Sequence, residues 1–368
     1  MLFNSLNFCL FLPIVVVTYY LMPYRFRWIL LLAASYFFYM CWNPYYVILI
    51  LLSTAVDYWA GLKMGACEKK ESKKKYLILS ILTNLGLLLY FKYYNFFAGS
   101  LNEIFLASEM NARVPLFEIL LPVGISFYTF QTLSYSFDVY RDKRKAETHF
   151  GIFALYVAFF PQLIAGPIER STTLIPQLKN KIKLIPENIM AGSGLIIFGL
   201  FKKVVIADRL AVYVDFIYSA PEVVLPGTMA LATFFFAFQI YCDFSGYSDI
   251  AIGTAKLLGI DLMENFRRPY FARNLSDFWS RWHISLFTWF RDYVYIPLGG
   301  NQVSMCRSSV NIMIVFAVSG LWHGANLTSA IWGLLHGTCL IGFKFISKLI
   351  FIRLSLAKLG SVHVGFII

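Results

Sequence analysis

The apolar positions of the chain gather into long runs that short polar stretches separate. Three runs open the sequence, at residues 8–22, 28–42 and 45–62, and two more follow at residues 76–97 and 115–140. A helix needs about 20 residues to cross the hydrocarbon core of a bilayer. The pattern therefore predicts five transmembrane helices in the first part of the chain.

Basic clusters agree with this topology. Residues 63–75, KMGACEKKESKKK, contain six lysines against two glutamates, and RDKRK follows at residues 141–145. Five crossings place both clusters on the same side as Arg25 and Arg27, and excess Lys and Arg marks cytoplasmic loops. We therefore expect the N-terminus outside. The first run lacks a basic leader and a cleavage site, so we interpret it as a retained span.

The pattern becomes less regular after residue 145. Residues 150–166 are apolar, but they lead to LKNKIK at residues 178–183, which again has a cytoplasmic character. An even number of crossings must separate two cytoplasmic loops, so this single run predicts a re-entrant segment buried in protein. Residues 189–205 and 225–259 are further helical candidates. We expect an interruption of the second at YCDFSGYSD, because its two aspartates are costly in lipid.

Composition supports an integral membrane protein with an all-α fold. The chain is 59% hydrophobic and 14% charged, whereas soluble domains are about 45–50% apolar and about 25% charged. The net charge of +12 is explained by cytoplasmic loops, without nucleic acid. The six cysteines show no C-x-x-C spacing, so no disulfide framework or thiolate metal site is indicated. We predict a single membrane domain over residues 1–368.

Residues 261–301 have a different character, with charged residues, aromatic residues and a histidine interleaved. No face of a helix there is compatible with lipid, which predicts amphipathic helices at the interface or packed inside a bowl-shaped protein. On a continuous helix, His283 shares a face with Trp279 and Trp282. An aromatic belt with a structural histidine is the alternative. Five arginines are available for anionic groups: Arg267, Arg268, Arg273, Arg281 and Arg291.

Two more histidines lie in SGLWHGANLTSAIWGLLHG, residues 319–337. Thirteen helical residues between His323 and His336 correspond to about 220° of rotation and a rise of about 20 Å, so the two side chains would face nearly opposite directions. At most one is then the central base. Asn326 follows His323 by three residues and can hydrogen-bond it or a substrate carbonyl, which favours His323. A purely structural histidine is the alternative.

Other catalytic templates are absent from the sequence. There is no G-x-S-x-G elbow, Walker loop, G-x-G-x-x-G or H-E-x-x-H motif. HGAN does not have metal-ligand spacing, so we predict no metal site.

Several long motifs resemble the membrane-bound O-acyltransferase (MBOAT) family, and most closely its bacterial branch that O-acetylates exported polysaccharides. RNLSDFWSRWHISLFTWFRDYVYIPLGGN is followed, forty residues after its histidine, by GLWHGAN. Motifs in the family's order extend over nearly the whole chain: LLAASYFFYMCW, FKYYNFF, LPVGISFYTFQTLSYSFDVYR, FFPQLIAGPIER, FGLFKKVVIAD and YCDFSGYSDIAIG.

The resemblance implies a ring of transmembrane helices around a central funnel, with re-entrant and interfacial helices. It also implies that His323 is the invariant family histidine and His283 the second. Polysaccharide-acetylating members usually continue beyond the segment matching residues 331–352, so we expect a form that is short at its C-terminus. The side chains that we expect to bind substrate are Asn326, Trp322, Trp282, Arg281, Arg291, Asp292 and Asn265.

The expected activity is acyl transfer in the inner membrane of a bacterium. A buried His323 would act as base while an acetyl or similar short acyl group moves from a cytoplasmic donor to hydroxyls of an exported polysaccharide. Acetyl-CoA is the expected donor substrate, with no bound cofactor, and an extracytoplasmic acetyltransferase is an expected partner that can relay the group. The alternatives are a transporter or flippase that uses the histidines as a proton relay, and a structural subunit.

Overall fold

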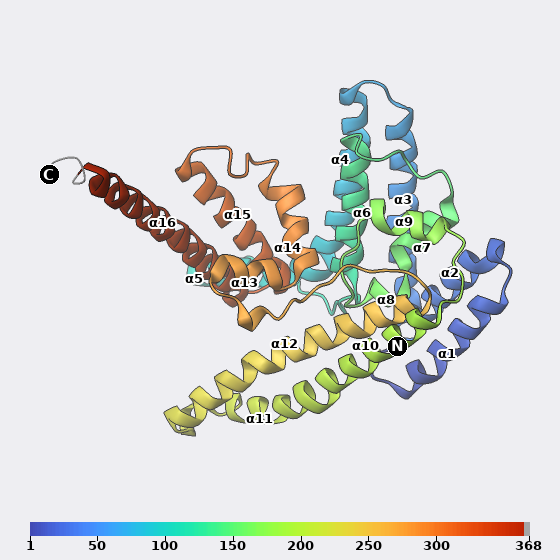
Figure 1. The fold of residues 1–368 in the computed structure, drawn as a ribbon, viewed down its shortest axis with the longest axis horizontal. Coiled ribbons are helices and arrows are strands. Elements are labelled where there is room, and N and C mark those ends of the chain that lie inside the picture. The colour runs from blue at the N-terminus through green and yellow to red at the C-terminus, as the bar shows by residue number, and fades with distance from the viewer. Residues whose placement is uncertain (364–368) are drawn as a thin grey trace. The chain divides into compact units, whose positions relative to one another are not determined.

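The computed structural model describes residues 1–363, and every regular element among them is helical. The chain divides into two compact units, Met1–Phe266 and Arg267–Ile368 (Figure 1). The single membrane domain predicted over residues 1–368 stays a prediction. The predicted shortness at the C-terminus concerns Ile368, which lies outside the described residues.

The first unit contains twelve α-helices in its described residues: α1 Leu6–Leu21, α2 Tyr24–Met40, α3 Val47–Ala66, α4 Lys70–Leu88, α5 Tyr94–Ala107, α6 Ile125–Tyr140, α7 Phe150–Ala158, α8 Phe160–Leu163, α9 Ser171–Lys179, α10 Pro186–Leu200, α11 Asp208–Tyr218 and α12 Pro226–Leu257. Short 3₁₀ turns lie at Pro44–Tyr46 (η1) and Pro221–Val223 (η4). The π-helical segments η2 Leu89–Tyr93 and η3 Phe201–Ala207 continue α4 into α5 and α10 into α11.

Six helical stretches in the described part of the chain are long and apolar enough to cross a membrane: Pro44–Ala66, Lys70–Ala107, Pro186–Tyr218, Pro226–Leu257, Met305–His323 and Leu327–Lys348. These stretches confirm the predicted all-α polytopic membrane fold. Helices α1 and α2 also form, but their 16 and 17 residues are shorter than a full span. The sidedness of the chain and the ring around a funnel stay predictions.

Two short buried helices occupy the predicted re-entrant segment. Helix α7 has nine residues, α8 has four, and residues 151–163 are all buried. A pair of helices this short cannot span a bilayer, which agrees with the prediction.

The apolar run at residues 115–140 becomes helical only at Ile125, so the prediction of a helix from residue 115 was wrong. Gly124 breaks the run with φ +77°, and a Cβ on it would lie 2.4 Å from the carbonyl oxygen of Leu163. Only glycine fits this left-handed position. Most side chains of α6 are buried in protein.

Helix α12 runs for 32 residues without a break, so the predicted interruption at residues 241–249 was wrong. The two aspartates are accommodated by cations on η3. Lys203 Nζ lies 2.6 Å from Asp243 Oδ1, and Lys202 pairs with Asp249. Figure 1 shows α10 and α11 following one another along α12. Gly192 and Gly199 allow the backbones of α10 and α12 to approach closely.

The second unit consists of the 3₁₀ turn η5 Pro269–Phe271, α13 Leu275–Arg281, α14 Ile284–Phe290, the π-helical η6 Arg291–Tyr295, α15 Met305–His323 and α16 Leu327–His363. Asn274 and Ser304 cap α13 and α15 by accepting hydrogen bonds from backbone N–H groups. Helices α15 and α16 pack as a hairpin that joins at residues 324–326. The hairpin and the α13–α14 corner carry the three histidines of this unit whose side chains are described.

Candidate active site

His283 lies at a corner of the chain rather than inside a helix. Helix α13 ends at Arg281, and α14 begins at Ile284. Between them His283 adopts φ 44° and ψ 54°, the left-handed region. The predicted continuous helix through Trp279 and His283 was therefore wrong. Left-handed backbone costs a non-glycine residue about 1–3 kcal/mol and is frequent at functional sites.

The imidazole of His283 is buried, with 3% of its surface exposed. Burial first, and the nearby His323 second, lower the pKa of His283 well below its ordinary value. A neutral imidazole at neutral pH has one N–H donor and one acceptor nitrogen. The Ser285 hydroxyl lies 3.5 Å from Nδ1 and fixes one side of the ring.

His323 is the last residue of α15, and the chain reverses directly after it. Its side chain is exposed, so the prediction of a buried base at this position was wrong; the buried imidazole is that of His283. The reversal leaves the end of α15 without a following helical turn to cover it. The imidazole of His323 is therefore open to solvent.

His323 and His336 pack against the same indole. Their ring centroids lie 5.3 and 4.6 Å from that of Trp332. The predicted opposite orientation was wrong because it assumed one continuous helix, whereas α15 ends at His323 and α16 folds back. A Cβ on Gly333 would lie 2.2 Å from the carbonyl oxygen of Phe316, so glycine is needed for this close return.

Indole rings connect all three imidazoles. Trp322, which is buried, lies between His323 at 4.8 Å and His283 at 6.1 Å between ring centroids. Trp279 lies 5.2 Å from His336. We call these six residues the histidine–indole cluster: Trp279, His283, Trp322, His323, Trp332 and His336.

A cavity of about 30 Å³ brings the two predicted catalytic residues together, because both His283 and His323 line it. Trp282, predicted as a substrate-binding residue, also lines this cavity. A second cavity of about 420 Å³ shares part of its wall and is bordered by Arg291 and Lys344. The side chains that line both cavities are Phe287, Val315 and Phe316. We call them the histidine cavity and the large cavity.

Sequence reasoning missed many of the residues that line these cavities, and three of them have polar groups of interest. Trp279 was considered only as a neighbour of His283, yet it lines the histidine cavity, and its buried Nε1 has no hydrogen-bond acceptor in the described part of the chain. Ser319 also lines this cavity, one turn before His323. Lys344 borders the large cavity. A lysine within an apolar run is itself a signal of function, and this signal was available in the sequence.

Asn326 caps α16. Its Oδ1 accepts hydrogen bonds from the Ser329 backbone N–H at 2.8 Å and from the Thr328 hydroxyl at 2.7 Å. This role differs from the predicted hydrogen bond to His323 or to a substrate carbonyl. The cap thus stabilises the start of α16, directly after the turn that follows His323.

Replacing Asn326 with alanine is therefore expected to reduce stability, by about 1 kcal/mol, as the loss of an N-cap does. Asn326→Asp is the matched control, since aspartate also caps a helix. Thermal unfolding in detergent measures both variants. Equal stability of wild type and Asn326→Ala would contradict a capping role.

Two arginines predicted to bind substrate, Arg281 and Arg291, are paired with acids close to them in sequence. Arg281 Nε lies 2.7 Å from Asp277 Oδ1, and this hydrogen bond lowers the pKa of Asp277 to about 2. Arg291 Nε lies 2.8 Å from Asp292 Oδ1, beside the large cavity. The remaining predicted residue, Asn265, belongs to the first unit and donates a hydrogen bond to the Ser248 hydroxyl at 3.0 Å.

Comparison with known proteins gives the family of the chain. Residues 33–353 match the sequence profile of the MBOAT, membrane-bound O-acyltransferase family. The chain is 43% identical over 339 residues to the probable alginate O-acetylase AlgI of Pseudomonas aeruginosa, covering 92% of this chain and 65% of that one. It is 39% identical over 336 residues to the peptidoglycan O-acetyltransferase of Helicobacter pylori, covering 84% and 63%.

A more distant similarity links the chain to the teichoic acid D-alanyltransferase of Bacillus subtilis, with 27% identity over 240 residues, 61% of this chain and 60% of that one. The chain thus spans about two thirds of the length of the first two of these relatives. The match to the family profile covers most of the chain, including both cavities. The chain belongs to the membrane-bound O-acyltransferase family.

Proposed function

We propose that this protein is a membrane O-acyltransferase that moves an acetyl or similar short acyl group to hydroxyls of an exported polysaccharide. One observation carries the proposal: His283 and His323 line the same cavity, one imidazole buried and the other exposed. Family membership and the names of the relatives, which include acetyl and D-alanyl transfer, support the reaction class.

His323 is the general base in this mechanism. Its ring nitrogen accepts the proton of the acceptor hydroxyl, and the hydroxyl oxygen attacks the carbonyl carbon of the acyl thioester. When the tetrahedral intermediate collapses, the carbon–sulfur bond breaks and the leaving thiolate takes the proton from His323. Positioned proton transfer of this kind contributes about 10²–10⁴-fold to a rate.

Donors in the histidine cavity stabilise the negative charge that develops on the carbonyl oxygen. The buried imidazole of His283 remains neutral, so it can donate an N–H without carrying a charge of its own. The indole N–H of Trp279 is a second candidate, because it is buried without an acceptor. Preorganised donors in a site that excludes water stabilise an oxyanion strongly.

The large cavity has the character needed for the donor. Its walls are mainly apolar, which suits the narrow arm that carries an acyl thioester, and it adjoins the histidine cavity. Lys344 Nζ donates hydrogen bonds to Asn301 Oδ1 and Ser308 Oγ, both at 3.0 Å. Both oxygens are neutral, so the positive charge stays available for a phosphate. We propose acetyl-CoA, or an acetylated carrier, as a cytoplasmic donor substrate.

The acceptor is too polar to enter the membrane, so it must meet the acyl group at an opening or receive it through a partner. We propose a bacterial inner-membrane location with the N-terminus outside, and an extracytoplasmic acetyltransferase as the partner that can relay the group. The basic clusters at residues 63–75 and 141–145 support the orientation of the N-terminus, and the polarity of the acceptor supports a partner.

Purified protein incubated with radiolabelled acetyl-CoA and an acidic polysaccharide tests the reaction class. We expect label in the polysaccharide, or in the partner when it is added, together with one free thiol for each group transferred. Boiled protein is the control. Movement of intact acetyl-CoA across proteoliposomes without release of thiol would contradict acyl transfer and favour a transporter.

A further inference from the structure

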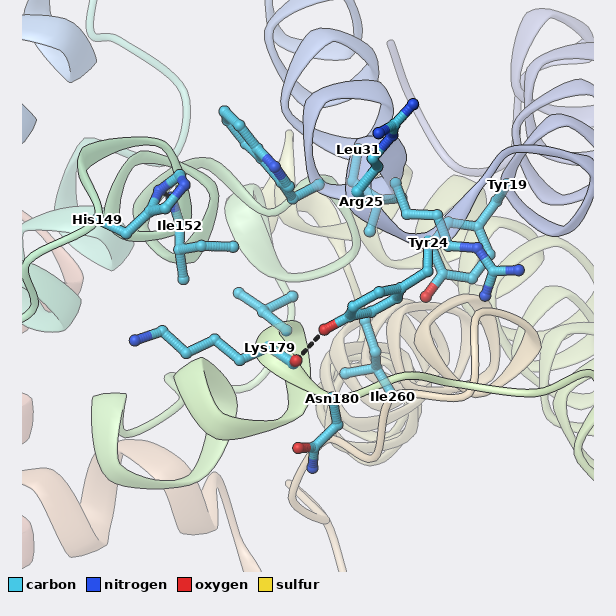
Figure 2. Close-up of a pocket in the computed structure, with 12 residues that line it drawn as sticks. Tyr19, Tyr24, Arg25, Leu31, His149, Ile152, Lys179, Asn180 and Ile260 are labelled. Atoms are coloured by element: carbon cyan, nitrogen blue, oxygen red, sulfur yellow. Dashed lines mark hydrogen bonds between the residues drawn. The ribbon is translucent and has the colours of Figure 1, made fainter.

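A cavity of about 290 Å³ lies within the first unit, far along the chain from the histidine–indole cluster, and His149 is among its lining residues. It is formed where α1 turns into α2, at the start of α7 and at the end of α9 (Figure 2). Apolar side chains make its walls, among them Trp28, Leu31 and Ile152. The described residues that line it include no aspartate or glutamate, whereas Arg25, Arg27 and Lys179 are among them. The cavity is therefore apolar inside and basic at its edge.

Arg27 is held in place without losing its charge. Its Nη1 donates to the Ile182 carbonyl oxygen at 2.6 Å, Nε to that of Met22 at 3.2 Å and Nη2 to that of Tyr20 at 3.3 Å. All three acceptors are neutral, so they fix the guanidinium without neutralising it. Arg25 is exposed and lies over the ring of Phe26 at 4.6 Å. Two cations thus occupy the corner between α1 and α2.

The opposite edge of the cavity is also basic. Lys179 Nζ pairs with Glu147 Oε1 at 2.7 Å, and the same carboxylate lies 3.7 Å from Arg144. The carboxylate of Glu147 is therefore shared by two cations. A neighbouring hollow of about 320 Å³ includes Lys179 and adds Arg144 and Lys145 to the basic surface. The Tyr24 hydroxyl donates a hydrogen bond to the Lys179 carbonyl oxygen across the cavity, as the dashed line in Figure 2 shows.

Helix α1 presents an apolar stripe that ends near this cavity. Its members, which are 58–81% exposed, recur every three or four residues and so share one face: Leu6, Leu10, Ile14, Val17 and Leu21. The opposite face of α1 is buried and contributes Tyr19 to the cavity wall. An exposed apolar face on a membrane protein is suited to contact with acyl chains. In sequence, Leu21 lies only four residues before Arg25.

We propose that this cavity binds the phosphate-bearing head group of an anionic phospholipid, with the phosphate at Arg25 and Arg27 and the acyl chains along the apolar stripe of α1. Basic pockets at the cytoplasmic side of membrane proteins recognise anionic head groups in this way. The volume is close to the lower end of the range of about 300–1,000 Å³ for ligand pockets. Soluble phosphates share the anion chemistry, but the adjoining stripe assigns the site to a lipid.

Native mass spectrometry of the detergent-purified 368-residue chain tests this site. We expect the protein to retain dioleoyl phosphatidylglycerol in preference to dioleoyl phosphatidylcholine. Arg25→Gln is expected to weaken binding of phosphatidylglycerol about fivefold, the contribution of one basic residue near an anionic head group, and Arg25→Lys is expected to preserve it. Lys74→Gln removes an exposed charge outside the cavity and is the matched control.

Arg27→Gln is expected to weaken binding further, and its melting temperature shows whether the loss of three carbonyl bonds has also disturbed the fold. Equal retention of the two lipids, or unchanged binding by Arg25→Gln, would overturn the proposal. Coenzyme A and inorganic phosphate are added as competitors. Displacement of phosphatidylglycerol by either at micromolar concentration would assign the cavity to a soluble phosphate instead. Because the readout is binding, its outcome is independent of acyl transfer.

Discussion

Replacing His323 with glutamine is expected to lower the rate of acyl transfer by about 10²–10⁴-fold, the contribution of a positioned general base. Glutamine has a similar size and can still form hydrogen bonds, but it cannot accept and release a proton near neutral pH. Because His323 is exposed at the end of α15, the substitution buries no new polar group. Transfer of labelled acetyl groups by membranes that contain equal amounts of each variant measures the effect.

The matched control is His336→Gln. His336 packs against Trp332, as His323 does, but it is not among the described residues that line the histidine cavity. We expect this variant to retain most of the activity. Full activity of His323→Gln would contradict the mechanism. An equal loss in both variants would assign the effect to disruption of the histidine–indole cluster rather than to proton transfer.

The second large effect is expected for stability, at the ion pairs between η3 and α12. Replacing Lys202 with methionine removes the partner of Asp249 and the hydrogen bond to Ser245 Oγ at 3.1 Å. Lys202 is 8% exposed. Removing one partner of a fully buried ion pair costs about 3–5 kcal/mol, and the Asp249 side chain is 20% exposed, so we expect a loss toward the lower end of this range. We expect a correspondingly lower free energy of unfolding.

Chemical denaturation in detergent, followed by the fluorescence of the tryptophans, measures this loss. The double variant Lys202→Met with Asp249→Leu removes both charges and is expected to recover most of the stability, since apolar replacement of a buried pair is often nearly neutral. A double variant that is no more stable than Lys202→Met alone would show that Asp249 is not the partner that matters.

The sequence was sufficient to predict those elements that the local pattern of apolar residues decides. Apolar runs of sufficient length predicted the spans within residues 45–62 and 76–97, and the short run at residues 150–166 predicted a segment that does not cross. Where two distant segments meet, the prediction failed. We expected the aspartates of α12 to interrupt the helix. They do not, because lysines of η3, some forty residues earlier, pair with them. A pairing of this kind cannot be seen in the sequence around either partner.

The candidate site shows the same limit. The family resemblance pointed to His283 and His323, and the structure places both at one cavity. The sequence did not reveal that His283 lies at a left-handed corner or that α15 ends at His323. Helical geometry was then applied to segments that are not continuous helices, which gave the wrong orientation for His336. Trp332 contacts His323 only because the chain reverses after α15, and Trp322 contacts His283 across a long sequence separation, so both contacts required the structure.

The wall shared by the two cavities has a consequence for the length of the acyl group. The histidine cavity measures about 30 Å³, less than a tenth of the volume of the large cavity, about 420 Å³. Under the proposed function, longer acyl chains would press against Phe287, Val315 or Phe316, the side chains that the two cavities share. Discrimination by a single methylene is typically worth about 1–3 kcal/mol. These three side chains would therefore favour transfer of acetyl over transfer of longer acyl groups.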